Sequence, residues 1–270
     1  MSETVRFFSV QVALLAVVLV LHTYMGLHII RRTLVFSDLV LDQLAAFGAL
    51  VGIGLGVRYG TPGSYFASFL AVLLGAGLLA LANPRNRLIP REAVIGTMYA
   101  LALVASLLLG DKLPGGGAYV TKTLAGSMLW VTWPLVAVTS LAYCVLIAFH
   151  WKFRARFTEL TDNPQSVRNP RLWDFLFFTT QGIITVLIVP VAGVLLAYAF
   201  LMIPAAIALL FTREWSRALA LGWSAGFVAC VAGLGSSYVF NWPYGPTLVL
   251  SLGAVFAGAC LVRFIAPART

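Results

Sequence analysis

The sequence predicts an all-α membrane protein, a polytopic transmembrane helical bundle of about eight to nine membrane segments. The 270 residues have a mean hydropathy of +0.95, and only 10% of them are charged, which is more apolar than a soluble globular surface tolerates. The apolar runs are each about 17 to 25 residues long, the length that a helix needs to cross the hydrocarbon of a bilayer. They lack the alternating polarity of a transmembrane barrel.

Nine apolar segments follow one another, separated by short polar or Gly/Pro-rich links. The first is expected to be a retained helix, because it is longer than a signal-peptide core and follows no strongly basic segment. The longest hydrophilic link, 151–171, has too few apolar residues for a domain of its own and is expected to be a loop. The chain is therefore interpreted as a single transmembrane domain over residues 1–270. We expect the segments at 7–29, 38–57, 64–82, 93–110, 127–150, 173–189, 191–211, 218–239 and 246–265.

The stretch from Trp173 to Phe211 allows two interpretations, because Pro190 and Pro204 interrupt its apolar residues. It forms two short crossings, or one long tilted helix followed by a short helix along the membrane face. With two crossings and a cytoplasmic carboxyl terminus, 14 of the 18 basic residues lie inside, as the positive-inside rule requires. One crossing leaves 8 inside and 10 outside, so two are favoured. The residues expected outside are Arg6, Arg58, Lys112 and Lys122. Those expected inside are Arg31, Arg32, Arg85, Arg87, Arg91, Lys152, Arg154, Arg156, Arg168, Arg171, Arg213, Arg217, Arg263 and Arg269.

Several classes of protein are disfavoured. The cysteines Cys144, Cys230 and Cys260 lie in apolar runs without metal-ligand spacing, which argues against a disulfide framework or a zinc knuckle. The basic residues gather in short loops, so they indicate orientation and no nucleic acid partner. No phosphate-binding G-x-x-x-x-G-K-[ST] motif occurs. We expect no cofactor of the chain's own, and any ATP would be used by another subunit.

Asp38 and Asp42 are the first functional candidates, because they lie one helical turn apart inside an apolar segment. An ionised carboxylate in hydrocarbon costs several kcal/mol, so such a group normally faces a protein interior, a water-filled path or a cation. The spacing places both on one helix face, and carboxylate oxygens suit Mn²⁺ and Fe²⁺ and also occur at zinc sites. The alternative is a pair at the helix end that is solvated or bound to Arg31 and Arg32.

Two further residues are secondary candidates. His22 is interpreted chiefly as a polar core residue, and it does not share a helix face with His28, six residues later. Asp174 opens an apolar segment after a basic run, where its charge suits the positive end of a helix dipole. The glycine-serine run at 233–237 is typical of close helix packing, which is also expected at Gly48, Gly52, Gly54 and Gly56.

Six segments, in order, resemble the permease subunit of bacterial ABC transporters for divalent metals, the ABC-3 family, and together they span most of the chain. The resemblance implies a homodimer in the bacterial inner membrane that works with an ABC ATPase subunit and an extracytoplasmic metal-binding protein, with Zn, Mn or Fe as substrate. The segments are GLHIIRRTLVFSDLVLDQLAAFG (26–48), PREAVIGTMYALA (90–102), LAGSMLWVTW (124–133), NPRLWDFLFF (169–178), VAGVLLAYAFLMIPAAIALLF (191–211) and GSSYVFNWPYGPTLVL (235–250).

The resemblance also implies roles for single residues. Asp38 matches an aspartate that lines the metal path near the dimer axis, and Asp42 stands where many members have a histidine. Because a carboxylate thus stands in place of an imidazole, the metal preference does not transfer. Some relatives also carry a Glu-His pair where this chain has GGGAYVTKT (115–123), so a variant with a changed cargo is an alternative. The stretch from Pro204 to Glu214 resembles the short cytoplasmic coupling helix that docks on the ATPase. The coupling residues implied are Pro204, Ala205, Ala206, Ile207, Ala208 and Arg213.

Other functions stay open beside the one implied by the resemblance. A secondary carrier would use the same carboxylates as a proton or cation relay without an ATPase partner. An ABC permease of the same fold would carry a non-metal cargo. A membrane enzyme or an assembly subunit is a third class, although no set of nucleophile, base and orienting group is recognisable.

Overall fold

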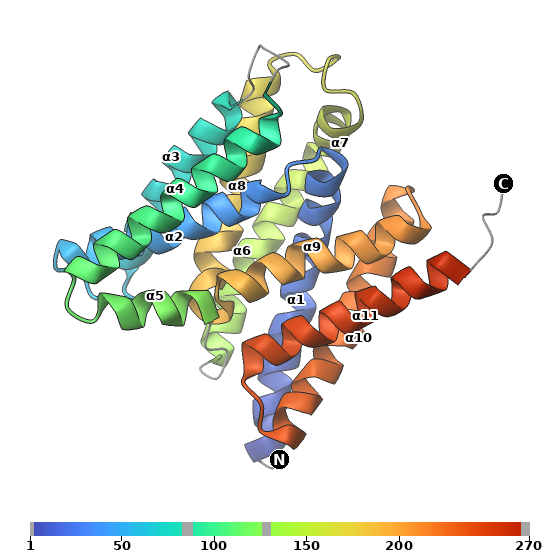
Figure 1. Ribbon diagram of the computed structural model, residues 1–270. Coiled ribbons are helices and arrows are strands. Elements are labelled where there is room, and N and C mark those ends of the chain that lie inside the picture. The colour runs from blue at the N-terminus through green and yellow to red at the C-terminus, as the bar shows by residue number, and fades with distance from the viewer. Residues whose placement is uncertain (1–2, 83–88, 126–130, 266–270) are drawn as a thin grey trace. The chain divides into compact units, whose positions relative to one another are not determined.

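The computed structural model describes residues 3–82, 89–125 and 131–265, and these residues form eleven α-helices and no strand (Figure 1). Nine of the described helices are long and apolar enough to cross a membrane, all except α5 and α7. The predicted all-α fold with eight to nine membrane segments is confirmed. The helices are α1 (Glu3–Arg31), α2 (Phe36–Gly54), α3 (Pro62–Leu81), α4 (Arg91–Lys112), α5 (Gly116–Ala125), α6 (Trp133–Lys152), α7 (Arg154–Asp162), α8 (Pro170–Ala192), α9 (Val194–Phe211), α10 (Trp215–Phe240) and α11 (Tyr244–Ile265).

The stretch from Trp173 to Phe211 forms two helices, as favoured, but the break lies elsewhere than at Pro190. Pro190 is inside the last turn of α8, and the chain turns at Gly193, whose φ is +79°. A glycine adopts this backbone conformation without the steric penalty of a Cβ atom. A proline close to the end of a membrane helix removes one backbone donor and is tolerated.

The predicted orientation depends on basic residues, some of which are not among the described ones. Arg85, Arg87 and Arg269 lie outside the described residues, and so does the side chain of Lys122. The inside and outside assignments therefore stay predictions.

The chain divides into two compact units, which we describe separately. Unit 1 comprises residues 1–30, 127–147 and 195–270, and unit 2 comprises residues 31–126 and 148–194. Two units of one chain can act as one domain, so the single domain over 1–270 stays a prediction.

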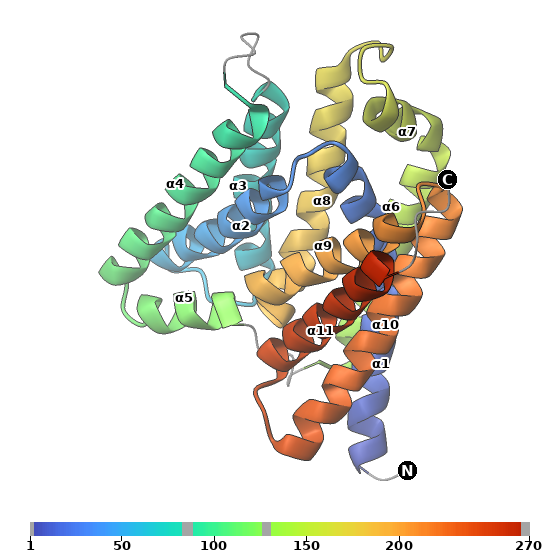
Figure 2. The same cartoon turned by 45° about the vertical axis from the view of Figure 1, so that its right-hand side comes forward.

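Unit 1 is built from α1, most of α6, and α9 to α11. Its small residues allow close helix packing: a Cβ atom at Gly26 of α1 would overlap the Leu201 carbonyl oxygen of α9, and one at Gly222 of α10 would lie 2.7 Å from the Pro204 carbonyl oxygen. α10 and α11 pack along each other, as Figure 2 shows. Leu27, Ala205, Ala208 and Ala218 form a buried cluster of this unit.

Unit 2 is built around α2, which packs against α3, α4 and α8. The expected close approach at Gly48 is confirmed, because a Cβ atom there would lie 2.6 Å from the Ala67 carbonyl oxygen of α3. It is not found at the other glycines of this run: Gly52 and Gly54 make ordinary contacts, and Gly56 faces open space. Gly56 instead has a φ of +84° after the end of α2.

The link at 151–171, expected to be a loop, contains a helix, α7. Phe157, Leu160 and Thr161 share one face of this helix and are buried, which gives the short segment an apolar side to pack against α8. A buried face of two apolar residues and one threonine was too weak a signal to be recognised in a basic sequence.

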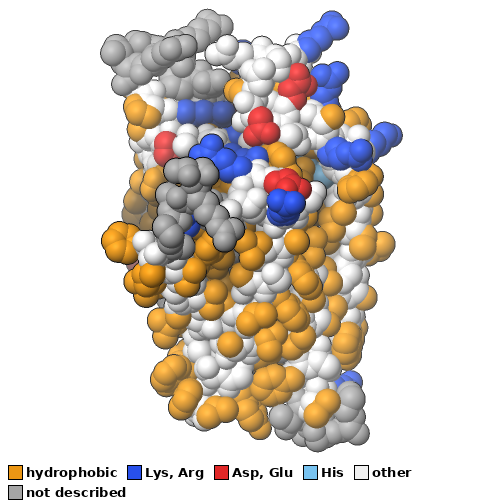
Figure 3. All heavy atoms as spheres, turned by 90° about the vertical axis from the view of Figure 1, so that its right-hand side faces the viewer, with side chains coloured by type: hydrophobic (Ala, Val, Ile, Leu, Met, Phe, Trp, Pro, Cys, Tyr) orange, Lys and Arg blue, Asp and Glu red, His pale blue; other side chains and the backbone are white. Residues whose placement is uncertain are grey.

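Hydrophobic side chains are spread over much of the surface seen in Figure 3. On α4, Leu101 and Leu108 are exposed, and on α11 so are Leu250 and Phe264. Exposed leucine and phenylalanine along helices of this length suit a lipid environment.

Candidate functional site

Asp38 and Asp42 lie in the first two turns of α2 and are buried, with 3% and 0% of each residue exposed. The arginines that could have neutralised them have other carboxylates as partners. Arg31 lies 3.5 Å from Asp162, and Arg32 pairs with Asp174. The alternative of a solvated pair at the helix end is therefore not what the structure shows.

The two carboxylates face α8 of the same unit. Gln181 of α8 donates a hydrogen bond from Nε2 to Asp38 Oδ1 at 2.8 Å. Thr185, one turn further along α8, is the hydroxyl that interacts with Asp42. Neither oxygen of Asp42 has a hydrogen-bond partner of ordinary geometry among the described residues. The site thus contains two adjacent carboxylates, one amide and one hydroxyl.

Within the described part of unit 2, no positively charged side chain pairs with Asp38 or Asp42. An amide and a hydroxyl donate hydrogen bonds but carry no positive charge. A buried ionised carboxylate is costly unless it is paired with a charge or coordinates a metal. The arrangement can therefore hold a cation, or a proton, between α2 and α8.

Asp174 has a different environment, although it lies on the same α8 face as Gln181, seven residues earlier. Its two oxygens pair with Arg32 and with Arg91, the latter at 3.0 Å. Arg91 also donates to the carbonyl oxygens of Ala82 and Leu79 at the end of α3. Burial lowers the pKa of the Arg32 guanidinium, and the charge of Asp174 opposes that effect.

Asp174 is therefore the centre of an ionic triad that ties the start of α4, the turn before α2 and the end of α3 to α8. The helix-dipole interpretation is replaced by these two ion pairs, because no acidic residue lies in the first turn of α8. Asp174 was a secondary candidate for cation binding, but its carboxylate is already paired with two positively charged side chains.

His22 belongs to unit 1, whereas the carboxylate pair belongs to unit 2. It is 2% exposed, its Nδ1 lies 3.0 Å from the Val18 carbonyl oxygen, and its ring packs beside Tyr143 and Phe200. Neutral imidazole in this position donates to the backbone, as a satisfied core residue does.

The residues expected to couple to an ATPase lie along α9 and just beyond it. Pro204 is inside α9 and does not begin a separate short helix, so the expected form of this segment was wrong. Ala205 and Ala208 are fully buried in unit 1, while Arg213 is exposed in the link that follows the helix. Packing against α1 and α10 explains the continuity, because the small residues around Pro204 let the three helices approach closely.

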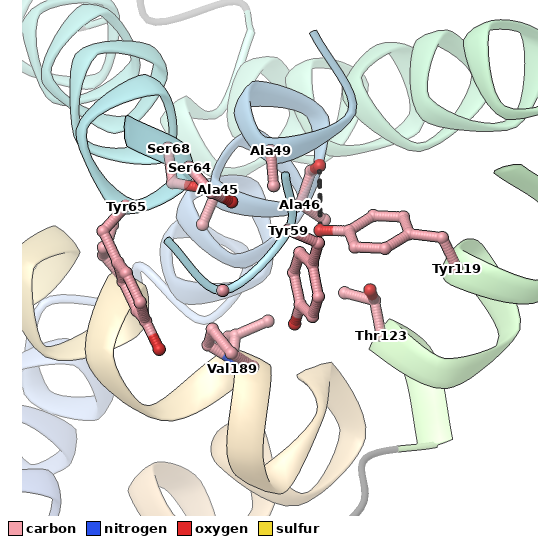
Figure 4. Close-up of a pocket in the computed structure, with 13 residues that line it drawn as sticks. Ala45, Ala46, Ala49, Tyr59, Ser64, Tyr65, Ser68, Tyr119, Thr123 and Val189 are labelled. Atoms are coloured by element: carbon pink, nitrogen blue, oxygen red, sulfur yellow. Dashed lines mark hydrogen bonds between the residues drawn. The ribbon is translucent and has the colours of Figure 1, made fainter. Parts of the chain in front are cut away.

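A small cavity of about 10 Å³ lies beside the carboxylate site (Figure 4). Its lining begins about one turn after Asp42 on α2 and directly after Thr185 on α8. The cavity corresponds to about one water molecule. The Tyr119 hydroxyl of α5 points at the Ala46 carbonyl oxygen, 3.5 Å away, and its ring packs edge-on against Tyr59 at 4.9 Å. The lining residues are Ala45, Ala46, Ala49, Tyr59, Gly60, Ser64, Tyr65, Ser68, Tyr119, Thr123, Val186, Val189 and Pro190.

Sequence reasoning missed Gln181, Thr185 and the two tyrosines. Tyr59 and Tyr119 lie in or next to links, where neither charge nor periodicity distinguishes them. Gln181 and Thr185 are polar residues four apart in a predominantly apolar helix, and that spacing was the available signal.

Comparisons with known proteins place the chain among membrane transport proteins. The family model described as "ABC 3 transport family" matches residues 6–263. A probable metal transport system membrane protein of Chlamydia pneumoniae is 25% identical over 88% of this chain and 83% of the relative. The manganese transport system membrane protein MntC of Listeria innocua is 23% identical over 86% of this chain and 81% of the relative.

A solved structure has the same fold. PsaBC from Streptococcus pneumoniae, determined in complex with Fab, matches with a TM-score of 0.75 and 21% identity, over 95% of this chain and 91% of the other.

Proposed function

Because the chain belongs to the ABC 3 transport family, we propose that it is the membrane permease subunit of an ATP-driven importer of divalent metal ions, Zn, Mn or Fe. Relatives named as metal and manganese transport proteins support this class of cargo. The observation that carries the proposal is the buried pair Asp38 and Asp42, whose charge no described arginine or lysine compensates. A divalent cation passing between α2 and α8 supplies the missing positive charge.

The chain is a transport subunit and not an enzyme. Its sequence has no phosphate-binding loop, so a separate ABC ATPase subunit binds and hydrolyses ATP. Two copies of the permease form the membrane part, and an extracytoplasmic metal-binding protein delivers the ion. Arg213, in the link that follows α9, contacts the ATPase. The second half of α9 supports this contact through Pro204, Ala205, Ala206, Ile207 and Ala208.

The protein lies in the bacterial inner membrane with its carboxyl terminus in the cytoplasm. This orientation follows from the basic residues of the links, which favour the cytoplasmic side. A phosphatase fused after Thr270 should be inactive and a fluorescent protein fused there should be bright. An active phosphatase would reverse the orientation.

The experiment that tests the function measures uptake of radioactive Mn²⁺ and Zn²⁺ by cells that express the whole transporter. Asp38→Asn should lower uptake to background at normal expression, and Asp42→Asn should lower it less strongly, because each change removes charge with little change in volume. Asp111→Asn is the matched control, since Asp111 is exposed at the end of α4. Wild-type uptake by the double variant Asp38→Asn/Asp42→Asn would refute the proposal.

The same assay separates the other classes. Uptake that persists without the ATPase subunit identifies a secondary carrier. An ATPase-dependent complex without metal uptake identifies a permease with another cargo.

A further inference from the structure

We propose that Gln181 is a third oxygen ligand of the transported cation, and that its side-chain amide donates to Asp38 before the cation binds. When a divalent cation enters, the amide turns and presents Oε1 to it. This inference rests on the proposed function and adds a specificity-determining residue on α8 to the carboxylate pair on α2.

The first support is the position of the amide. Gln181 is 1% exposed, and its Nε2 lies 2.8 Å from Asp38 Oδ1. It is placed there by close helix packing, because a Cβ atom at the neighbouring Gly182 would overlap Val72 of α3. The backbone of α8 is thus held against α3 at the level of the carboxylates.

The second support is a set of buried oxygen atoms without a hydrogen-bond partner of ordinary geometry among the described residues. They are Gln181 Oε1 and both carboxylate oxygens of Asp42. A buried polar atom left unpaired costs about 1 to 3 kcal/mol, more when it is charged, and such atoms in native proteins call for an explanation. All three are acceptors, and one cation satisfies all three.

The third support is the number of ligands. The described residues contain no group of three or more His, Cys, Asp or Glu side chains that could hold a metal ion. Cations such as Mn²⁺ and Ca²⁺ take about six or more ligands, and side-chain amide carbonyls are among the oxygen donors found in such sites. Two carboxylates need further oxygen donors, and Gln181 is the neighbouring residue whose amide can provide one.

The Gln181 amide needs to move little to present Oε1 in place of Nε2. The terminal torsion of glutamine joins an sp³ to an sp² carbon and is broad, so the amide can rotate while the rest of the side chain keeps its rotamer. In the empty site, Nε2 reduces the repulsion between the carboxylates. In the loaded site, Oε1 replaces part of the hydration shell of the cation.

The test compares Gln181→Leu, Gln181→Glu and Gln43→Leu in the assembled transporter, purified with its ATPase and reconstituted in lipid. Gln43 is the matched control: it is equally buried on α2, next to Asp42, and its Nε2 has no hydrogen-bond partner among the described residues. The probe is Mn²⁺ alone, and the readouts are its dissociation constant and the side-chain carbonyl band in infrared difference spectra.

We expect Gln181→Leu to weaken Mn²⁺ binding about 10- to 100-fold, as loss of a residue that supports a metal site does. The Mn²⁺-induced shift of the glutamine carbonyl band should disappear in this variant and persist in Gln43→Leu. Gln181→Glu keeps an oxygen ligand, so it should retain binding and release the ion more slowly, which lowers the maximal uptake rate more than it changes the KM. If Gln181→Leu does not assemble, Gln181→Met, of similar volume, provides the same comparison.

The inference is overturned if Gln181→Leu binds Mn²⁺ as tightly as Gln43→Leu, or if the carbonyl shift survives the substitution. With uptake still lost in the Asp38→Asn/Asp42→Asn variant, that result leaves the proposed function in place. Wild-type uptake by the double aspartate variant would instead remove the function on which the inference rests.

Discussion

Asp42 and Asp174 are both buried in unit 2, yet only Asp174 is neutralised by arginine side chains. Arg32 and Arg91 each contact one oxygen of Asp174, whereas the oxygens of Asp42 have no hydrogen-bond partner of ordinary geometry among the described residues. The same residue type thus has two roles. Asp174 connects structural elements, and Asp42 is available to a mobile cation.

Asp174→Asn should destabilise the protein, whereas Asp42→Asn should not. Removing one partner of a buried ion pair leaves unpaired charge and costs about 3 to 5 kcal/mol, and here two partly buried guanidinium groups lose their counter-charge. Denaturant unfolding of the purified protein in detergent measures the difference, with Asp111→Asn as the exposed control. An unfolding midpoint for Asp174→Asn equal to that of the control would show that the triad contributes little.

Gly182→Ala should separate α8 from α3. The added Cβ atom would overlap Val72, a β-branched side chain with little rotamer freedom in a helix, and overpacking of this kind costs about 1 to 3 kcal/mol. We expect a lower thermal midpoint and weaker Mn²⁺ binding, since Gln181 moves with the helix. Gly77→Ala is the control, because its new Cβ atom would make only an ordinary contact with Phe175. Equal behaviour of the two variants would contradict the packing argument.

Tyr119 should titrate late in an alkaline titration. Burial raises the pKa of its hydroxyl to about 12 from the usual 10.0. The folded protein therefore keeps a proton that the unfolded chain loses, so the free energy of unfolding is unchanged below pH 10 and falls between about pH 10 and 12. When the alkaline titration is followed by tyrosinate absorbance, the curve of the Tyr119→Phe variant should lack the step near pH 12. A step near pH 12 that persists in Tyr119→Phe would contradict the assignment.

Arg213→Glu should uncouple ATP hydrolysis from transport. Arg213 is exposed beyond the end of α9, and reversing its charge would weaken a contact with the ATPase. The measurement is metal-stimulated ATPase activity of the reconstituted complex, together with co-purification of the ATPase subunit. Arg156→Glu, on the exposed side of α7, is the control. Undiminished stimulation in Arg213→Glu would place the docking site elsewhere.

The membrane helices could be predicted from the sequence because hydrophobic length is a local property of the chain. Their ends were less predictable. Pro190 appeared to mark a break, but the structure places the turn at Gly193, where a positive φ is needed. The helix at Arg154–Asp162 was missed because only packing against α8 reveals its short apolar face.

The candidate site was found in part. Asp38 and Asp42 stand out in sequence, since an ionised group in an apolar segment is unusual wherever the helix lies. Gln181 is 143 positions away from Asp38 along the chain, and glutamine alone carries no signal strong enough to assign it to a site.

The chain's composition and spacing by themselves determined that this is a helical membrane protein and that two carboxylates share one helix face, because both follow from local periodicity and the cost of burying charge. Only the tertiary structure decided which aspartate is neutralised. That outcome depends on Arg32, Arg91 and Gln181 being brought to their partners by the packing of α8 against α2 and α3, and the energy of a buried charge is set by what surrounds it in space.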